Sequence, residues 1–126
     1  MIIELSADVT PVPQSRPRLG RRGAYEEPRV AAYKSILRAK ARCAMKCRAP
    51  LEGIIEAQVC IRRNKKIDSR AFGDIDNHLK AVFDAMNGVC YADDAQIARV
   101  DVRKVQAAEE GVDIILRNEK KPSEDG

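Results

Sequence analysis

Hydrophobic and polar residues alternate in four segments of the chain, and in two others apolar residues recur every three or four positions. Alternation is typical of a strand with one buried face, and the longer spacing is typical of an amphipathic helix. The predicted strands cover residues 1–9, 54–62, 96–106 and 112–116, and the predicted helices cover residues 26–48 and 75–86. The order β-α-β-α-β-β predicts one small α+β (mixed α/β) domain, with a mixed sheet packed against two helices.

The second predicted helix has an apolar side and a charged side. Its apolar stripe, which we expect in the core, consists of Ile75, Leu79, Val82, Phe83 and Met86. On the opposite side Asp76, Lys80 and Asp84 follow at the spacing that aligns side chains along a helix. His78, the only histidine of the chain, projects beside the apolar stripe. This position indicates a packing or hydrogen-bonding residue rather than a catalytic base.

Basic residues dominate the first half of the chain. The net charge is +4 at pH 7, with the basic excess before residue 50 and an acidic excess after residue 74. In residues 11–23, three prolines and two glycines are expected to exclude regular structure. A positive surface attracts a phosphate backbone. The predicted DNA-binding residues are Arg16, Arg18, Arg21, Arg22, Arg62, Arg63, Lys65, Lys66 and Arg70.

Within this basic chain, carboxylates cluster at the start of the second helix and in the link that follows it. Asp74 and Asp76 lie within one turn of each other and can converge on one point. Asp94 can join them if residues 91–95 fold back past that end. Carboxylate oxygens are the ligands that Mg²⁺ prefers. The pattern predicts a metal-dependent nuclease, with Lys80 placed to contact a phosphate oxygen or the attacking water.

The same residues can also have structural roles. Asp74 or Asp76 can cap the helix and complement its dipole, and Lys80 can pair with Asp76 one turn away. An EF-hand also begins with Asp-x-Asp, but its sixth and twelfth positions would be Leu79 and Ala85 rather than Gly and Glu. The EF-hand is therefore excluded, whereas capping explains one aspartate but not all of the clustered carboxylates.

The run Asp74-Ile-Asp76-Asn77-x-x-Lys80-Ala81-x-x-Asp84-Ala85, followed by Asp93-Asp94-x-Gln96, resembles the RusA family of Holliday junction resolvases. The similarity covers roughly residues 60–117. The loop Pro11-x-Pro13-x-x-Arg16-Pro17-Arg18 is similar to that of many phage-type members. The resemblance implies a RusA-like endonuclease domain over residues 1–117, and residues 118–126 are expected to form a disordered tail.

The resemblance also implies an activity and a set of active residues. The activity is that of a homodimer that binds four-way DNA junctions and resolves them by paired symmetric nicks in DNA recombination and repair. Asp74, Asp76 and Asp94 match the catalytic, metal-binding aspartates, Lys80 matches the catalytic lysine, and Asp93 matches a supporting metal residue. The implied cofactor is Mg²⁺, with Mn²⁺ as an alternative. No organic cofactor and no membrane partner are expected.

Two other functions fit the same residues. A nuclease for other branched DNA, such as flaps or forks, would use the same carboxylates, and a non-catalytic DNA-binding module would use them only to cap and bridge. The link through Asn87-Gly88 is more compact than in the best-known bacterial member, which bears on junction or sequence preference. The chain shows no signal-peptide pattern and no apolar run of membrane-spanning length. We therefore expect a cytoplasmic protein, with a prophage origin suggested by the family.

Overall fold

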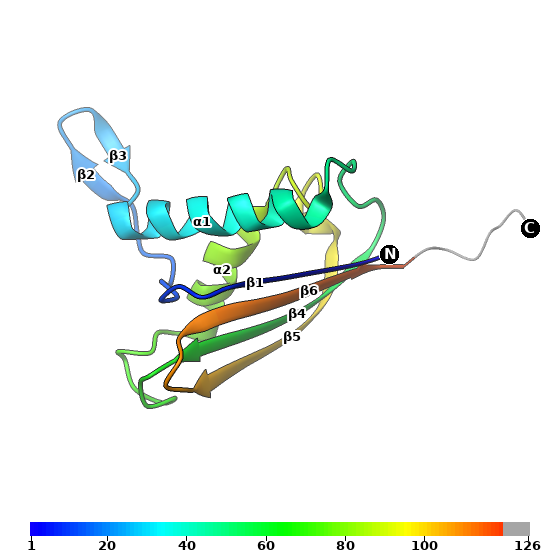
Figure 1. Cartoon of the computed structure of the whole chain (residues 1–126). Helices are drawn as coiled ribbons and strands as arrows, with labels where there is room; N and C mark the ends of the chain where they lie inside the picture. The colour runs from blue at the N-terminus through cyan, green and yellow to red at the C-terminus, as the bar shows by residue number, and fades with distance from the viewer. Residues whose placement is uncertain (120–126) are drawn as a thin grey trace, which may run out of the picture.

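The computed structural model describes residues 1–119 and confirms the α+β class (Figure 1). The elements are β1 (Ile2–Ala7), β2 (Arg18–Gly20), β3 (Gly23–Tyr25), α1 (Pro28–Met45), β4 (Ile55–Arg63), α2 (Ile75–Met86), the 3₁₀ turn η1 (Asp94–Gln96), β5 (Ile97–Gln106) and β6 (Gly111–Asn118). Within this range, no helix combines the length and hydrophobicity needed to cross a membrane. The tail expected after residue 117 falls mostly outside the described residues.

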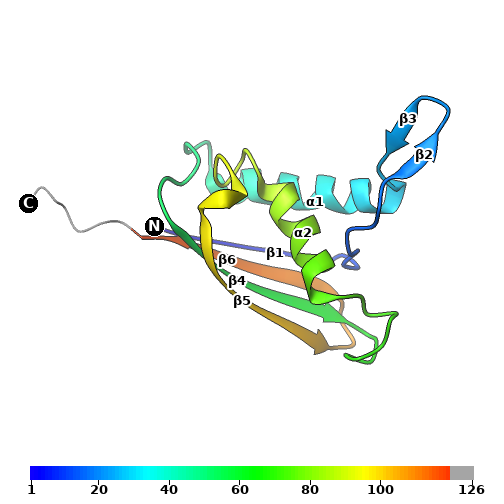
Figure 2. The same ribbon diagram turned by 180° about the vertical axis from the view of Figure 1, so that it is seen from behind.

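Four strands form one sheet in the order β1-β6-β4-β5. β4 and β5 are parallel, whereas β6 is antiparallel to both β1 and β4. A parallel pair needs a crossover connection, and α2 supplies it between β4 and β5. Both helices cover the same face of the sheet, as the two ribbon views show (Figures 1 and 2). No helix or strand of residues 1–119 covers the other face, and β1 and β5 are the edge strands.

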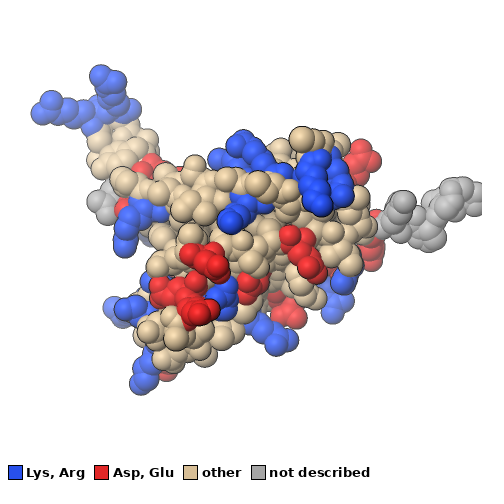
Figure 3. Space-filling model, in the orientation of Figure 1, with Lys and Arg blue, Asp and Glu red and all other residues tan. Residues whose placement is uncertain are grey.

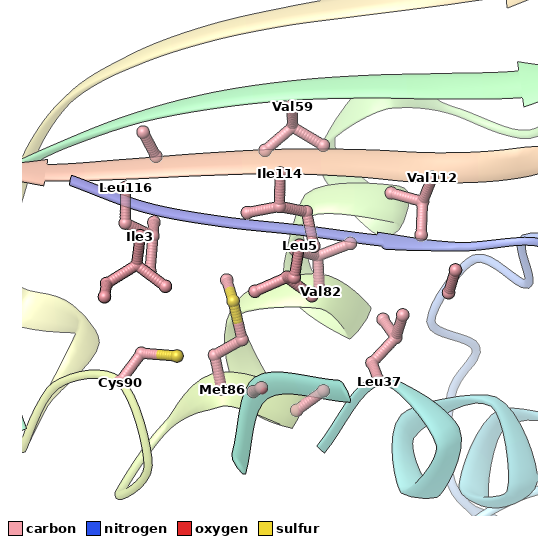
Figure 4. Close-up of a cluster of buried hydrophobic side chains, with 14 of the residues drawn as sticks. Ile3, Leu5, Leu37, Val59, Val82, Met86, Cys90, Val112, Ile114 and Leu116 are labelled. Atoms are coloured by element: carbon pink, nitrogen blue, oxygen red, sulfur yellow. The ribbon is translucent and has the colours of Figure 1, made fainter. Parts of the chain in front are cut away.

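The core lies between the helices and the covered face of the sheet (Figure 4). Every second residue of β1, β4 and β6 points into it, as the burial of Ile55, Ala57, Val59 and Ile61 along β4 shows. With two phenylalanines and no tryptophan in the sequence, most of this core is aliphatic. The alternating patterns predicted for residues 1–9, 54–62 and 112–116 are thereby confirmed, whereas β5 lies at the sheet edge and has no buried residue.

One prediction for α2 is wrong, because Ile75 is 38% exposed instead of buried in the core. A helical side chain leans toward the preceding turn, and Ile75 is the first helical residue, with no preceding turn to pack on. The buried residues of α2 are His78, Ala81, Val82, Ala85 and Met86. The burial and hydrogen bonding expected for His78 are confirmed.

The absence of regular structure expected in residues 11–23 is also wrong in part. Strands β2 and β3 form a hairpin with a two-residue turn, Arg21-Arg22, between Gly20 and Gly23. All three prolines precede β2, so none of them removes a hydrogen-bond donor from the hairpin. Gly23 has φ 106°, a conformation that glycine adopts at little steric cost.

Candidate active site

Asp74 and Asp76 lie at the start of α2, and both side chains are exposed. Asp74 occupies the N-cap position, but its carboxylate makes no capping hydrogen bond. In the described part of the chain no ion pair joins Asp76 to Lys80. The capping and salt-bridge roles considered from the sequence are therefore not realised here. Both carboxylates remain available for a ligand.

Two side chains hold the backbone immediately before Asp74. The Phe72 carbonyl oxygen accepts a hydrogen bond from His78 Nε2 at 2.7 Å and another from Arg63 Nη1 at 2.8 Å. Arg63 Nη1 also donates to the Ala71 carbonyl at 2.8 Å. His78 is fully buried and the Phe72 ring is buried beside it. The segment that presents Asp74 is thus anchored to both β4 and α2.

Gly73, between Phe72 and Asp74, has no room for a side chain. Its φ is 98°, in the region that favours glycine. A Cβ atom at this position would lie 2.8 Å from His78 Nε2 and 3.0 Å from Pro13 Cγ. Glycine therefore permits both the turn into α2 and the contact that anchors it.

We expect Gly73→Ala to destabilise the fold and to lower cleavage by displacing Asp74. Gly88→Ala is the matched control, since Gly88 has φ 82° and no heavy atom within 4 Å of an added Cβ. Backbone strain alone should cost about 1–2 kcal/mol in each variant, and the clash should add about 1 kcal/mol at Gly73. Urea denaturation measures both. Equal losses of stability in the two variants would show that the close packing at Gly73 is unimportant.

The environment of His78 favours the neutral form of its imidazole. Burial lowers its pKa, the hydrogen bond to the Phe72 carbonyl opposes this effect, and the charges of Arg63 and Lys104 lower it further. Because a carbonyl can only accept, Nε2 carries the proton in this contact. Nδ1 is buried and has no hydrogen-bond partner among the described groups. Protonation would therefore add an N–H at Nδ1 that has no described acceptor, near the charges of Arg63 and Lys104 and opposed only in part by the charge of Asp74.

A stability profile against pH tests this account of His78. The pKa of His78 is lower in the folded state than in the unfolded state. The contribution of neutral His78 to the free energy of unfolding is therefore complete above about pH 6.5 and is lost as the pH falls toward the folded-state pKa. The unfolding free energy of the unmodified protein should therefore decrease between pH 7 and pH 5. His78→Phe should lack this part of the decrease. Identical pH profiles for the two proteins would contradict the assignment.

Asp93 and Gln96 shape the segment that carries Asp94. Asp93 Oδ1 accepts from the Ala95 amide at 3.0 Å, and Gln96 Oε1 accepts from the Asp93 amide at 3.1 Å. Gln96 Nε2 also donates to the carbonyl oxygens of Leu51 at 2.9 Å and Gly53 at 3.0 Å. Asp93 thus has a structural role as the cap of η1. Its role as a supporting metal residue stays a prediction.

Asp94 lies near Asp84 and not beside Asp74 and Asp76. Burial raises the pKa of Asp94, as do a hydrogen bond and the charge of Asp93 and then the charge of Asp84. Asp84 itself pairs with buried Lys34, whose Nζ lies 2.6 Å from Asp84 Oδ2. Along α2, Asp76 and Asp84 are separated by about 12 Å, at ~1.5 Å per residue.

The topology of the sheet explains this separation. Asp94 precedes β5, and Gln96 hydrogen-bonds this turn to Leu51, before the start of β4. Asp74, in contrast, follows the other end of β4. β4 is nine residues long, or about 25–30 Å. Over residues 1–119, no three acidic, histidine or cysteine side chains converge closely enough to hold a metal ion. The fold-back that would bring Asp94 to Asp74 does not occur within one chain.

The basic loop reaches the Asp74 end of α2. The Gln14 amide donates to the Asn77 carbonyl at 2.9 Å, and a groove of about 470 Å³ there is lined by residues that include Ser15, Arg70 and Asp74. Figure 3 shows Lys and Arg side chains on the hairpin and over the surface near α1. The predicted DNA contacts with exposed side chains are Arg16, Arg21, Arg22, Lys65, Lys66 and Arg70.

The other predicted DNA contacts differ in their surroundings. Arg62 Nε donates to Asp113 Oδ2 at 3.0 Å, and Arg62 Nη1 donates to the Glu109 carbonyl at 3.0 Å. Arg63 holds the Phe72 segment, a structural role that sequence reasoning missed because Arg63 stands in a run of basic residues. The Arg18 side chain lies outside the described part of the structure. DNA binding by these three arginines stays a prediction.

A comparison with protein families gives one result for the whole domain. The family model described as Endodeoxyribonuclease RusA matches residues 8–117 of the 126-residue chain. The match includes the basic loop, both helices, the carboxylates at the two ends of α2, strands β4 and β5, and β6 up to residue 117. No curated protein sequence matches the chain significantly.

Proposed function

The chain belongs to the RusA family of endodeoxyribonucleases, which resolve Holliday junctions, and from this premise we propose a Mg²⁺-dependent resolvase that makes paired symmetric nicks. The process it serves would be DNA recombination and repair in the cytoplasm. One observation carries the proposal. Asp74 stands at a helix N-cap without capping it, on a backbone anchored by His78 and Arg63. This arrangement holds a carboxylate ready for a ligand in a groove that a basic loop borders.

The donor chemistry of the site fits a hard divalent cation. Asp74, Asp76 and Asp94 offer carboxylate oxygens, which suit Mg²⁺ and also Mn²⁺, and Asp93 would support them. Burial and neighbouring carboxylates raise the pKa of Asp94, which means that its charged form is disfavoured. A bound cation would stabilise that charged form. When bound, the cation would activate water and neutralise charge that develops on the scissile phosphate.

The protein residues have separate tasks in this proposal. Asp74 and Asp76 bind the cation, and their rigid backbone fixes where the phosphate must lie. Lys80 is exposed one turn after Asp76, on the same side of α2. From there its ammonium contacts a phosphate oxygen or orients the attacking water. Either role lowers the barrier, because a positive charge is already in position when negative charge develops in the transition state. Arg16, Lys65 and the other exposed basic residues bind the DNA backbone.

A homodimer would reunite the separated carboxylates. The outer edge of β5 is unpaired by any described strand, and an edge of this length is a template for pairing with another chain. In an antiparallel pairing centred on Val100, Arg99 faces Asp101 of a second copy, a favourable pairing of charges. In the same register Ile97 of the second copy faces Arg103, which brings η1 and Asp94 of the second copy toward the Gln106 end of β5. Two such sites related by two-fold symmetry match the two cuts that a junction requires.

The end of β5 lies close to the Asp74 segment. Lys104 Nζ is 4.7 Å from the centre of the Phe72 ring, two residues before Asp74. Asp94 of a second copy, brought toward the Gln106 end of β5, would therefore approach the carboxylates at the start of α2. This arrangement supports a metal site that draws Asp74 and Asp76 from one subunit and Asp94 from the other.

A substrate panel tests the proposed specificity. Mobile and immobile four-way junctions, flaps, forks and linear duplexes are incubated with the protein and Mg²⁺, and the nicks are mapped on each strand. We expect nicks at symmetric positions on opposite strands of the four-way junctions. Single nicks confined to flaps or forks would favour a nuclease for other branched DNA. Binding of every substrate without a cut would favour a non-catalytic module.

A further inference from the structure

The β2–β3 hairpin contributes to neither the carboxylate site nor the core. Its strands pair with each other as a separate two-stranded sheet. Both ribbon views show it projecting from the domain next to the first turn of α1 (Figures 1 and 2). An isolated hairpin of this size is marginally stable in water. A projecting arm of this kind is suited to contact with another molecule.

The two faces of the hairpin carry apolar side chains on a thin backbone. Leu19 is 86% exposed and lies opposite Ala24, so both point from one face. On the other face the ring of Tyr25, 49% exposed, lies over Gly20, where an added Cβ would be 3.1 Å from the ring. The hairpin is therefore a thin two-stranded arm, which we call the blade, with an aliphatic face and an aromatic face.

The tip of this blade is strongly basic. Arg21 and Arg22 form the two-residue turn, and both are exposed. Figure 3 shows their end of the molecule as a basic projection. Guanidinium groups bind phosphate oxygens in a two-pronged geometry, so the tip complements a nucleic-acid backbone. An apolar blade with a cationic tip fits DNA whose bases can be separated.

We propose that the hairpin enters the branch point of a four-way junction, where Leu19 wedges between base pairs and Arg21 and Arg22 bind the surrounding phosphates. This inference rests on the proposed function. DNA-bending proteins insert leucine and similar apolar side chains between base steps. Unstacking is easiest where base stacking is already interrupted, as at a branch point. Leu19 would thus add preference for junctions, whereas the arginines would add affinity for any DNA.

The test uses a synthetic four-way junction with 2-aminopurine at a branch-point base, without Mg²⁺ so that binding proceeds without cleavage. The unmodified protein should raise the emission as the base unstacks, and it should bind the junction more tightly than a linear duplex. Leu19→Ala should abolish the rise in emission and lower the preference for the junction by about tenfold, with duplex affinity unchanged. Ile54→Ala, at a residue 49% exposed and distant from the hairpin in sequence, is the matched control and should change neither.

The tip is tested separately with the double variant Arg21→Ala, Arg22→Ala. Its affinity should fall for junction and duplex alike, because phosphate contacts carry no structural preference of their own. The slope of log K against log salt concentration should become less steep by about 2, since two phosphate contacts are lost. A loss of affinity for the junction alone would contradict the assignment of these arginines to the phosphates.

Other results overturn the hairpin proposal without touching the proposed function. If Leu19→Ala keeps the emission rise and the junction preference while the unmodified protein cuts junctions with Mg²⁺, the wedge is excluded and the resolvase stands. If Leu19→Ala instead halves the native mass, the hairpin is a subunit contact and the wedge is again excluded. Failure of the unmodified protein to bind the junction would overturn both proposals.

Discussion

Asp76→Asn is expected to reduce junction cleavage by about a hundredfold to a thousandfold, while junction binding is retained or becomes tighter. The substitution removes a charged oxygen ligand from the proposed metal site, and a single well-placed charged group is worth about 10²–10³ in rate. Binding should persist because the basic contacts are untouched. It should tighten if removal of a negative charge reduces repulsion of the phosphates. Cleavage rate and dissociation constant are measured on the same labelled junction.

Asp68→Asn is the matched control for this prediction. Asp68 is exposed in the loop between β4 and α2, and it undergoes the same change of charge and shape outside the proposed site. Its cleavage rate should stay close to that of the unmodified protein. If Asp76→Asn cleaved as well as Asp68→Asn, Asp76 would have no catalytic role and the non-catalytic module would gain support.

A mixture of Asp76→Asn and Asp94→Asn subunits is expected to cut one strand of the junction, although each variant alone is inactive. In a mixed dimer, the Asp94→Asn subunit supplies intact Asp74 and Asp76, and the Asp76→Asn subunit supplies intact Asp94. One of the two sites is then complete and the other lacks both residues. With random exchange, about half of the dimers would be mixed. The expected product is a single nick in each cut junction.

Mixing Asp76→Asn with Asp74→Asn provides the control. Both changes lie in the part of the site that one subunit contributes, so neither site of a mixed dimer would be complete. This mixture should remain inactive. Activity in neither mixture, with subunit exchange verified by native mass after one variant has been isotope-labelled, would exclude the shared site. Asp94 would then have to reach Asp74 by a rearrangement within one subunit.

The regular elements of this fold were predictable because their patterns are local. Alternation in β4 places Ile55, Ala57, Val59 and Ile61 on one face, and the structure buries all four. The α2 helix begins at Ile75 and ends at Met86, as its periodicity predicted. Each pattern arises because one face of the element is buried. The pattern can be read from the residues of that element alone. Ile75 fits the pattern but is exposed, because it is the first residue of the helix and has no preceding turn to pack on. The periodicity alone does not show which residue is first.

The hairpin was not predicted because the three prolines before it indicated irregular structure for the whole of residues 11–23, and the spacing of its two glycines was not used. Pro11, Pro13 and Pro17 all precede β2, whereas Gly20 and Gly23 flank a two-residue turn, which is the common length for a hairpin. The glycine spacing was thus the signal available in the sequence. Proline excludes a ladder bond only at its own position.

The position of Asp94 could not be predicted because it depends on contacts between distant segments. Gln96 binds the carbonyl oxygens of Leu51 and Gly53, which fixes the segment near the start of β4. The sequence distance between Asp76 and Asp94 permits either end of α2. Likewise, the anchoring of Phe72 by Arg63 depends on how β4 meets the following loop. Motif spacing identified the candidate residues, but the sheet topology decides which of them meet.

The most direct test of the central claim is cleavage of a four-way junction by the unmodified protein with Mg²⁺, compared with an identical reaction in EDTA. Both reactions are run at a protein concentration where the junction is fully bound. We predict symmetric paired nicks with Mg²⁺ and intact, bound junction in EDTA. An intact junction in both reactions, or equal cleavage in both, would contradict a metal-dependent resolvase built on Asp74, Asp76 and Asp94.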